Sequence, residues 1–471
     1  MKQLKKISIG LLSMAAALPL HAATLTIQIA DSAGEGFNDP AVVAPIGGNT
    51  GTTLGEQRLQ VFQEAADIWG ALLNSNVTIV INAQFDPQTC SQQGAVLGSA
   101  GATNVFADFT NAPVANRWYS SALADSIADS DLNPGSADIN ATFNSALDTG
   151  CLNNGWYYGL DGATPAGFTP LLPVVLHEMG HGLGFQTFTS GSTGAFIQGR
   201  PDIWTDFMLD VETNETWSQM ASNADRVASA INDPNLVWTG PNVTAEQGNF
   251  LGPLPQLVIN APASLAGNYP IQTASFGPPI PNNGLTGDIV LAEDNDTTGD
   301  VNDGCDTITT DLTGVIALVN RGACNFTVKV ANAQAAGAIG VLVANNAPSG
   351  LPPMGGADGT ITIPSAGITQ ALGQALSGVV LADVIFADGF DPLEVNNGTL
   401  EFDQNQFAGS NGGFVRLFAP DPFQGGSSVS HWTTDANPNL LMEPSITSTI
   451  FDEVDLTLYL YEDIGWSINE P

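Results

Sequence analysis

The spacing of apolar residues in the first part of the chain predicts a mixture of helices and strands. Over residues 56–73 the apolar positions recur as on one face of a helix: Leu59, Phe62, Ala66, Trp69 and Leu73. Residues 77–81 are rich in β-branched side chains and residues 138–143 alternate between apolar and polar, so we expect both to be strands. Pro173 suits the first turn of a helix, and the apolar stretch that follows it, residues 174–184, is expected to be helical.

A second unit is predicted after residues 252–281, where Pro, Gly and Asn are so dense that we expect a domain boundary. Residues 314–320 and 339–344 are apolar runs typical of buried strands, and residues 326–336 between them predict a helix. Two smaller segments complete this α/β unit, residues 360–364 and a short helix over 370–376. The last part of the chain contributes a Gly/Ser loop and a final helix, at residues 425–430 and 456–463.

The N-terminus has the pattern of a secretory signal peptide over residues 1–22. Three lysines precede a short apolar run at residues 7–20, and Ala22 supplies a small residue for cleavage. No later stretch approaches the roughly 18 apolar residues of a membrane-spanning helix. We therefore expect a soluble mature protein that is exported to the periplasm or secreted.

The charge balance excludes one class of partner. The chain has 10 Lys and Arg against 47 Asp and Glu, a formal net charge of −37 at pH 7. A surface this negative repels phosphate, so we expect neither nucleic-acid binding nor docking on an anionic membrane.

Four cysteines follow the signal: Cys90, Cys151, Cys305 and Cys324. In an oxidising compartment an even number predicts two disulfide bonds, for which three connectivities exist. We favour Cys90–Cys151 with Cys305–Cys324, because each pair then lies within one predicted domain.

The segment LHEMGHGLGF, residues 176–185, contains an HExxH motif. On a helix His177 and His181 project from one face, one turn apart, so both can bind one tetrahedral zinc ion. Glu178 can reach a water molecule held by the metal without being a ligand itself. We expect Glu178 to act as general base when that zinc-activated water attacks a peptide carbonyl.

A catalytic zinc ion needs three protein ligands and one open position. The chain has four histidines, and His21 is lost with the signal, so His431 is the remaining histidine beside the pair in the motif. The elongated motif HExxHxxGxxH places its third histidine six positions after the second. Here Gly184 is in place, but Thr187 occupies the position of that histidine.

The HExxH motif, the Ser-His-Trp sequence at His431 and the sequence LLMEP around Met442 together resemble the leishmanolysin-like branch of the metzincin proteases. In that branch an insertion precedes the third histidine, and a Met-turn follows it. The resemblance implies an α+β zincin fold with His177, His181 and His431 as zinc ligands and Glu178 as general base. Met442 is then a packing support below the metal rather than a ligand.

The insertion has a resemblance of its own. Residues 321–340, RGACNFTVKVANAQAAGAIG, followed by VLVANN, resemble a protease-associated (PA) domain. The resemblance implies a bridge between Cys305 and Cys324, and a non-catalytic module that covers an active site or binds protein segments. A spacer domain is the alternative interpretation.

These resemblances divide the chain into a signal peptide, a first metalloprotease part, an inserted α/β PA domain and a second metalloprotease part: residues 1–22, 23–255, 256–385 and 386–471. The sequence as a whole predicts an exported zinc metalloendopeptidase that acts on protein or peptide substrates.

Two alternatives stay open. Asp202, Asp206 or Glu212 is close enough to the motif to provide the third ligand in place of His431. A protein of another class is the second alternative: a secreted or surface binding protein that keeps a non-catalytic zinc site and holds partners with the PA domain. Glu178 argues against it, because structural zinc sites usually close all four positions with protein ligands and need no base.

The acidic loop Glu293–Asp303 gives weak support to a calcium site. Oxygen-rich loops suit calcium, and Asp294, Asp296 and Gly299 begin like an EF-hand, but Cys305 stands where the bidentate glutamate is required. We expect a solvated loop.

Overall fold

The computed structural model describes residues 22–92, 94–152, 154–281, 284–295, 297–348, 350–356, 358–386, 395–445 and 450–469. The chain forms two compact units, one made of Met1–Phe250 and Ser410–Pro471 and the other of Leu251–Gly409. The expected signal peptide lies outside the described residues except for Ala22.

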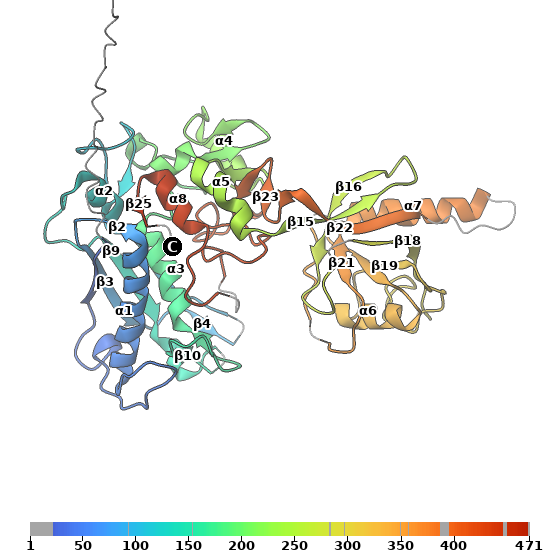
Figure 1. Cartoon of the computed structure of the whole chain (residues 1–471), viewed down its shortest axis with the longest axis horizontal. Coiled ribbons are helices and arrows are strands. Elements are labelled where there is room, and N and C mark those ends of the chain that lie inside the picture. Colours follow the sequence, from blue (N-terminus) through green and yellow to red (C-terminus); the bar gives the residue numbers. More distant parts are fainter. Residues whose placement is uncertain are drawn as a thin grey trace, which may run out of the picture. The chain divides into compact units, whose positions relative to one another are not determined.

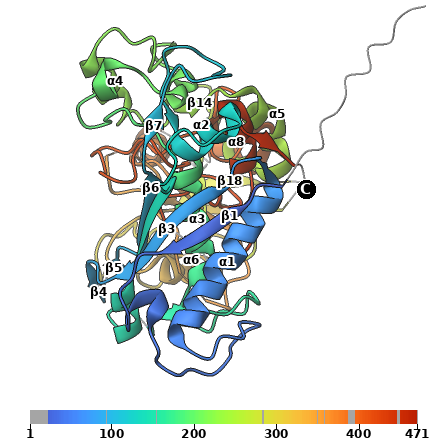
Figure 2. The same ribbon diagram turned by 90° about the vertical axis from the view of Figure 1, so that its left-hand side faces the viewer.

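The first unit contains a four-stranded sheet, in which Figure 2 shows β6, β3 and β1 side by side. Its strand order is β1, β3, β9, β6, formed by Leu25–Ile29, Ile79–Asp86, Ile139–Asn144 and Gly98–Ala102. The first three strands are parallel, and β6 is the antiparallel edge strand. Helix α1 (Leu54–Leu72) connects β1 to β3, and helix α3 (Leu171–Leu183) packs against α1, β6 and β9 (Figure 1).

The elements predicted in this region are confirmed with shifted ends. The helix predicted over residues 56–73 is α1, which begins earlier because the side chain of Thr53 caps its first turn. The strands predicted at 77–81 and 138–143 are β3 and β9. The predicted HExxH helix is α3, and Pro173 lies in its first turn, where a missing N–H removes no intrahelical hydrogen bond.

A second sheet of the first unit joins segments from before and after the other unit. Its antiparallel strands are, in order, β13, β12, β14, β24 and β23: Glu215–Thr216, Met208–Asp210, Leu236–Trp238, Phe414–Arg416 and Ser410–Asn411. Val237 of β14 pairs with Arg416 of β24, so the chain returns to the same sheet. Helix α8 (Thr457–Ile464), the final helix of the prediction, packs against α5 (Pro241–Phe250).

The other elements of the first unit are short: β2 (Leu73–Asn74), β4 (Cys90–Ser91), β5 (Gly94–Ala95), β7 (Val105–Phe106), β8 (Tyr119–Ser120), α2 (Ser121–Ala128), β10 (Trp156–Tyr157), β11 (Thr169–Pro170), α4 (Asn223–Ser229) and β25 (Ser467–Ile468), with 3-10 turns at Gly36–Asn38, Ser145–Thr149, Ile197–Gly199 and Ile203–Asp206. Strands β2 and β25 pair with each other, which ties the end of α1 to the last described residues.

The second unit contains one eight-stranded sheet. Its order is β16, β15, β22, β18, β19, β20, β21, β17: Gly267–Pro270, Pro253–Ile259, Val395–Phe407, Leu285–Leu291, Ile316–Asn320, Gly340–Ala344, Ser365–Ile368 and Gln272–Thr273. Strands β18 to β21 are parallel, and the outer strands are antiparallel. Helices α6 (Phe326–Ala335) and α7 (Gln370–Phe386) lie on opposite faces of the sheet (Figure 1).

Alternate residues of the central strands face the two helices. In β19, Ile316 and Leu318 belong to the core under α7, whereas Ala317 and Val319 belong to the core under α6. A strand buried on both faces needs a continuous apolar sequence, which is why the two apolar runs predicted β19 and β20 correctly.

The second unit ends later than the expected boundary at residue 385. Strand β22 pairs with β15 and β18, so residues up to Gly409 belong to the second unit and not to the part that was expected to follow it. The helix predicted over 370–376 also continues, to Phe386. The sequence of β22, VNNGTLEFDQNQF, lacks the apolar run by which the buried strands could be predicted.

Candidate metal centre

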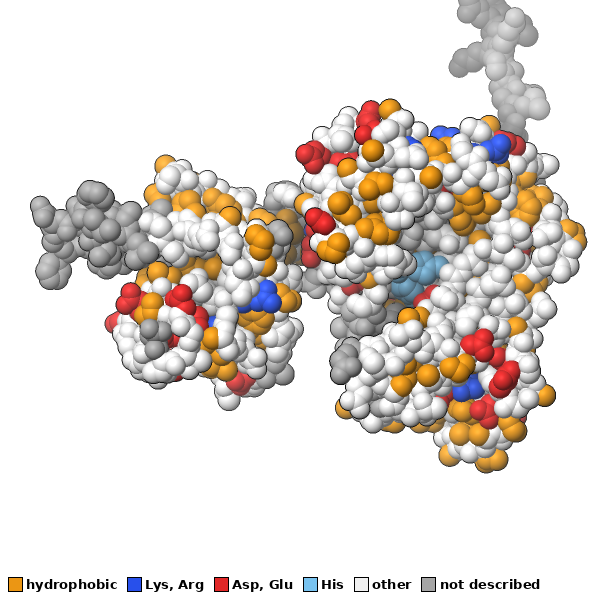
Figure 3. Space-filling model, turned by 180° about the vertical axis from the view of Figure 1, so that it is seen from behind, with side chains coloured by type: hydrophobic (Ala, Val, Ile, Leu, Met, Phe, Trp, Pro, Cys, Tyr) orange, Lys and Arg blue, Asp and Glu red, His pale blue; other side chains and the backbone are white. Residues whose placement is uncertain are grey.

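Three histidine side chains meet at one point of the first unit. The Nε2 atoms of His177, His181 and His431 lie 3.2 Å from one another in each pair. Figure 3 shows histidine surface at the floor of a hollow in this unit. Within the described residues this is the one group of three or more side chains placed to hold a metal ion. The structure therefore brings together the three histidines that the sequence analysis selected.

Each imidazole is oriented by a backbone carbonyl. The oxygen lies 2.7 Å from Nδ1 in all three cases and belongs to Leu441 for His177, to Phe185 for His181 and to Ser427 for His431. Because a carbonyl only accepts hydrogen bonds, each Nδ1 carries the proton and donates it. Each Nε2 is left with a lone pair, and the three lone pairs face one another.

The end of α3 provides the partner of His181. Gly184 ends the helix at φ 133°, a conformation that residues with side chains rarely adopt. The chain reverses there, and the backbone N–H of Phe185 donates to the carbonyl oxygen of Gly180 at 3.0 Å. This reversal turns the carbonyl of Phe185 toward the imidazole of His181.

The segment that carries His431 is fixed between two neighbours. The backbone N–H of Phe418 donates to the carbonyl oxygen of His431 at 2.9 Å. The N–H of the next residue, Trp432, donates to the carbonyl oxygen of Met442 at 2.8 Å. These two bonds hold the third histidine against the α3 pair, although the segments are far apart in sequence.

Met442 packs directly against α3. Its side chain is fully buried, and its sulfur lies 2.8 Å from the position that a Cβ on Gly180 would occupy. A side chain at position 180 would therefore require Met442 to shift. Met442 therefore fills the space under the helical turn between His177 and His181.

Glu178 belongs to helix α3, and its side chain lies against the edge strand β6. The residue is 9% exposed, and its carboxylate accepts a hydrogen bond from the backbone N–H of Ala100. A Cβ on Gly98 would lie 3.4 Å from Cγ of Glu178, so the small residues of β6 allow a close approach. Burial raises the pKa of Glu178 to about 7.

Burial also keeps the three imidazoles neutral. It lowers the pKa of His177 to about 4 and that of His181 to about 3, and it lowers the pKa of His431 well below its ordinary value. Neutral imidazole is the form that binds metal ions.

The centre opens into a cavity of about 760 Å³, lined by residues 94–100 and by the segment after Met442. Glu443 lines this cavity and was missed in the sequence. Its carboxylate accepts hydrogen bonds from the N–H of Leu440 at 2.8 Å and from Nδ2 of Asn439 at 2.9 Å. Burial raises the pKa of Glu443 to about 7. Its position directly after Met442 is the signal that could have drawn attention to it.

Asp455 is a second missed residue, and it acts on the centre through Leu441. Its buried carboxylate accepts hydrogen bonds from the backbone N–H groups of Leu441 and Thr457. The carbonyl of the same Leu441 receives the Nδ1 proton of His177. Asp455 thus fixes the residue that orients one imidazole.

The three acidic alternatives to His431 have other partners. Asp202 is buried and accepts hydrogen bonds from Thr187 and from three other groups nearby. Asp206 pairs with Arg117 at 2.7 Å, and Glu212 accepts a hydrogen bond from Asn232 at 3.1 Å. None of these acids belongs to the histidine group within the described residues.

Both favoured disulfide bonds are present. Cys90–Cys151 lies in the first unit and Cys305–Cys324 in the second. Two disulfide bonds fit an extracellular protein. Among the described residues, no helix combines the length and the apolar character needed to cross a membrane.

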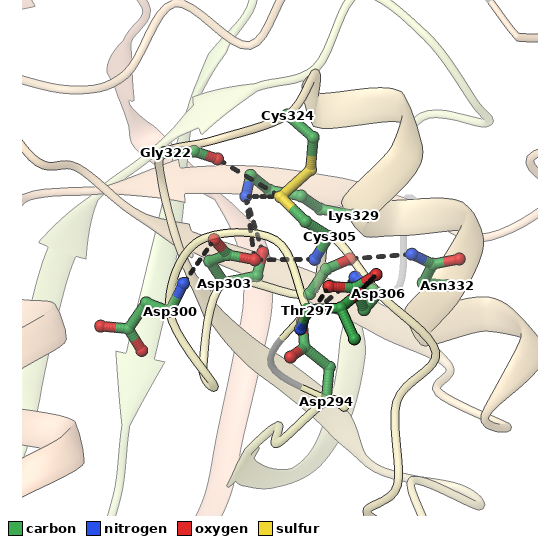
Figure 4. The surroundings of a disulfide bond; sticks show 11 residues. Asp294, Thr297, Asp300, Asp303, Cys305, Asp306, Gly322, Cys324, Lys329 and Asn332 are labelled. Carbon is green, nitrogen blue, oxygen red and sulfur yellow. Dashed lines mark hydrogen bonds and ion pairs between the residues drawn. A yellow bond between two sulfur atoms is a disulfide. The ribbon is translucent and has the colours of Figure 1, made fainter.

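The acidic loop surrounds a lysine (Figure 4). The ammonium of Lys329 is completely buried and donates to the carbonyl oxygen of Asp303 at 2.7 Å and to Sγ of Cys305 at 3.1 Å. The carboxylate of Asp303 lies 3.9 Å from it and accepts N–H groups of Asp300 and Cys305. The described part of the loop brings no three carboxylates together as metal ligands.

Comparison with known proteins identifies part of the second unit. Residues 285–376 match the PA domain family, so the chain contains a PA domain, as the resemblance of residues 321–340 implied. Vacuolar-sorting receptor 2 of Arabidopsis thaliana is 31% identical over 153 residues, which are 30% of this chain and 24% of the receptor. Probable leucine aminopeptidase 2 of Aspergillus fumigatus is 39% identical over 92 residues, 19% of this chain and 18% of that protein. The chain thus spans about a quarter or less of these relatives.

Solved structures similar to part of the chain include peptidases. A zinc aminopeptidase from Bacillus subtilis is 25% identical with a TM-score of 0.23, covering 35% of this chain and 37% of that one. An aminopeptidase from Aneurinibacillus sp. strain AM-1 is 19% identical with a TM-score of 0.22, covering 43% and 41%. TM-scores this low do not establish a shared overall fold.

Proposed function

We propose that the chain is an exported zinc-dependent endopeptidase of the metzincin type, resembling the leishmanolysin-like branch. The observation that carries the proposal is the convergence of His177, His181 and His431 beside the carboxylate of Glu178 in one cavity. The PA domain and the peptidase among the relatives support peptidase activity.

The spacing of the three nitrogens suits zinc. With Zn–N bonds of about 2.0–2.1 Å in tetrahedral geometry, two ligand nitrogens are about 3.3–3.4 Å apart. The observed Nε2 separations are 3.2 Å. Three lone pairs facing one another at this distance repel unless a cation lies among them, so His177, His181 and His431 would hold the ion.

Glu178 has the position of a proton acceptor. A zinc ion, when bound, lowers the pKa of a water molecule and polarises a carbonyl group. Glu178 adjoins His177 in sequence but is not part of the histidine group, and the N–H of Ala100 fixes its carboxylate. The carboxylate can therefore receive a proton during hydrolysis and return it to the leaving amine.

The edge strand β6 suits a peptide substrate. Residues Gly98 to Ala100 line the cavity, and β6 is the terminal strand of its sheet. An extended peptide can add to such an edge through main-chain hydrogen bonds, which places its peptide groups beside Glu178. Recognition through the main chain needs no free chain end, and it therefore favours an endopeptidase.

The alternative function is a binding protein with a non-catalytic zinc site. A receptor among the relatives favours it. The position of Glu178 in the cavity argues for catalysis, because a site that only holds zinc has no use for a carboxylate beside its open face.

Hydrolysis of a reduced and alkylated protein by wild type and Glu178→Gln, at matched zinc content, tests the proposal. We expect the variant to lose activity by about 10²- to 10⁴-fold, because the amide accepts no proton while it keeps the shape of the carboxylate. A peptide blocked at both ends must also be cut if the enzyme is an endopeptidase. If neither protein cleaves while both hold zinc, the binding protein becomes the better interpretation.

A further inference from the structure

The chain buries the one lysine that follows the expected signal peptide. Lys329 of α6 is 0% exposed, although an ammonium group loses its hydration when it is buried. Its partners are the carbonyl oxygen of Asp303 at 2.7 Å, the carboxylate of the same residue at 3.9 Å and Sγ of Cys305 at 3.1 Å (Figure 4). A buried positive charge therefore lies directly against one sulfur atom of the Cys305–Cys324 disulfide bond.

This sulfur atom is a poor partner for an ammonium group. A disulfide sulfur carries no charge and accepts hydrogen bonds only weakly. The carboxylate of Asp303 already accepts the backbone N–H groups of Asp300 and Cys305, at 3.0 Å and 2.8 Å. A thiolate at Cys305 would instead form a charge-assisted hydrogen bond with Lys329. The surroundings of Cys305 thus suit the sulfur of a reduced cysteine better than that of a disulfide.

The other cysteine of the pair is the accessible one. Cys324 lines a cavity of about 570 Å³, and its neighbours Ala323 and Asn325 are exposed. Cys305 does not belong to the lining of this cavity. Arg321 lines it as well, and its positive charge attracts an anionic nucleophile such as a thiolate. An incoming thiolate therefore meets Cys324 first, with Cys305 as the leaving group.

The Cys90–Cys151 disulfide bond lacks such a charge. Its cysteines are half-buried, as Cys305 and Cys324 are. Within the described part of the chain, no Lys or Arg side chain forms a hydrogen bond with either of its sulfur atoms. Because the exposure of the cysteines is similar, the ammonium of Lys329 is the difference that bears on the leaving group. The two bonds can therefore be compared within one molecule.

We propose that Cys305–Cys324 is an exchangeable disulfide bond, in which a dithiol reductant modifies Cys324 and Lys329 stabilises the thiolate that leaves at Cys305. The sulfur of the incoming thiolate bonds to Sγ of Cys324 while the Cys305–Cys324 bond breaks, and its electron pair stays on Sγ of Cys305. The second thiol of the reductant then loses its proton to solvent and attacks the reductant sulfur of the mixed disulfide. Cys324 is released as a thiolate, and the reductant becomes a disulfide. Two electrons thus pass from the reductant to the cysteine pair.

Exchange separates two segments that line neighbouring cavities. Asp300 and Asp303 of the acidic loop line a further cavity of about 610 Å³, which shares Arg321, Gly322 and Ala323 with the first. The disulfide bond ties this loop to the turn after β19. A dithiol can therefore loosen the walls of both cavities by opening one bond.

Timed reduction of the folded mature chain by dithiothreitol, quenched with iodoacetamide and read by peptide mass spectrometry, tests the proposal. We expect Cys305–Cys324 to open at least about 10-fold faster than Cys90–Cys151, because the stabilised thiolate is the better leaving group. With glutathione in place of the dithiol, the first mixed disulfide should form at Cys324. Similar rates for the two bonds, or a mixed disulfide that forms first at Cys305, would overturn the proposal.

Lys329→Gln isolates the effect of the charge, since the amide can still donate to the carbonyl oxygen of Asp303. We expect this variant to open Cys305–Cys324 about 10-fold more slowly than wild type, with its circular dichroism retained. Arg200→Gln is the matched control. It removes the same charge from the first unit, where Arg200 pairs with Asp108, and should leave the rate unchanged.

A folded Lys329→Gln variant that exchanges as fast as wild type overturns the proposal. If the variant does not fold, the two wild-type measurements decide. None of these readouts depends on peptidase activity, so the proposed function and the exchangeable bond can fail separately.

Discussion

At the scale of single residues, buried acids away from the metal centre influence how stability depends on pH. Asp125 in α2 and Asp138 before β9 are 3% and 7% exposed. Burial and the neighbouring Asp138 raise the pKa of Asp125 to about 7, against the opposing hydrogen bond from the N–H of Leu132. Burial also raises the pKa of Asp138. The pair therefore favours a shared proton in the folded state.

Replacing Asp125 by asparagine should remove part of this pH dependence. The folded pKa lies above the unfolded value of 3.8, so the folded state binds the proton more tightly, and the free energy of unfolding falls as pH rises from about 4 to about 7. Asp125→Asn stays neutral, so we expect its stability relative to wild type to increase from pH 4 to pH 8. Urea unfolding of both proteins across this range measures the difference. A difference that does not change with pH would contradict the assignment.

At the scale of elements, the proposed metal centre is built from helix α3, the segment from His431 to Met442 and the segment that contains Asp455. Helix α3 supplies two imidazoles, and the segment from His431 to Met442 supplies the third imidazole and the carbonyl that orients His177. Asp455, just before α8, ties this segment down through Leu441. Packing between Met442 and Gly180 joins the helix to the segment.

Shortening Met442 should therefore destabilise the first unit and weaken metal binding together. We expect Met442→Ala to lower the free energy of unfolding by about 2–5 kcal/mol, because it leaves a cavity under α3. Met442→Leu, which conserves volume, should cost less than about 1.5 kcal/mol. Urea unfolding and competition with a zinc chelator measure the two effects. An alanine variant with the stability and zinc affinity of wild type would show that the contact is unimportant.

The sequence predicted those parts of the candidate site that lie within one continuous segment or that involve histidine, which is rare in this chain. The HExxH spacing predicted α3, and the scarcity of histidine pointed to His431. Glu443 and Asp455 could not be selected, because they are two among 47 acids and only the fold shows which acids are buried. The edge strand β6 was missed as well, since its sequence, GSAGA, has low strand propensity and small side chains.

At the scale of the whole molecule, the first unit is interrupted by the second. The N–H of Ala408 donates to the carbonyl oxygen of Gly252 at 2.9 Å, so the two ends of the second unit are neighbours. An insertion with adjacent ends can fold without separating the flanking parts. The pairing of β14 with β24 then returns the chain to the first unit before His431. The proposed zinc site is complete only when both flanks have folded together.

The zinc content of wild type and His431→Ala after dialysis against a weak chelator tests this central claim most directly. Asp206→Ala is the matched control. Asp206 was an alternative third ligand in the sequence, but in the structure its carboxylate pairs with Arg117. We expect one zinc ion per chain in wild type and in the control, and a loss of most zinc from His431→Ala while its circular dichroism is retained. A His431→Ala variant that keeps one tightly bound zinc ion would contradict the three-histidine centre.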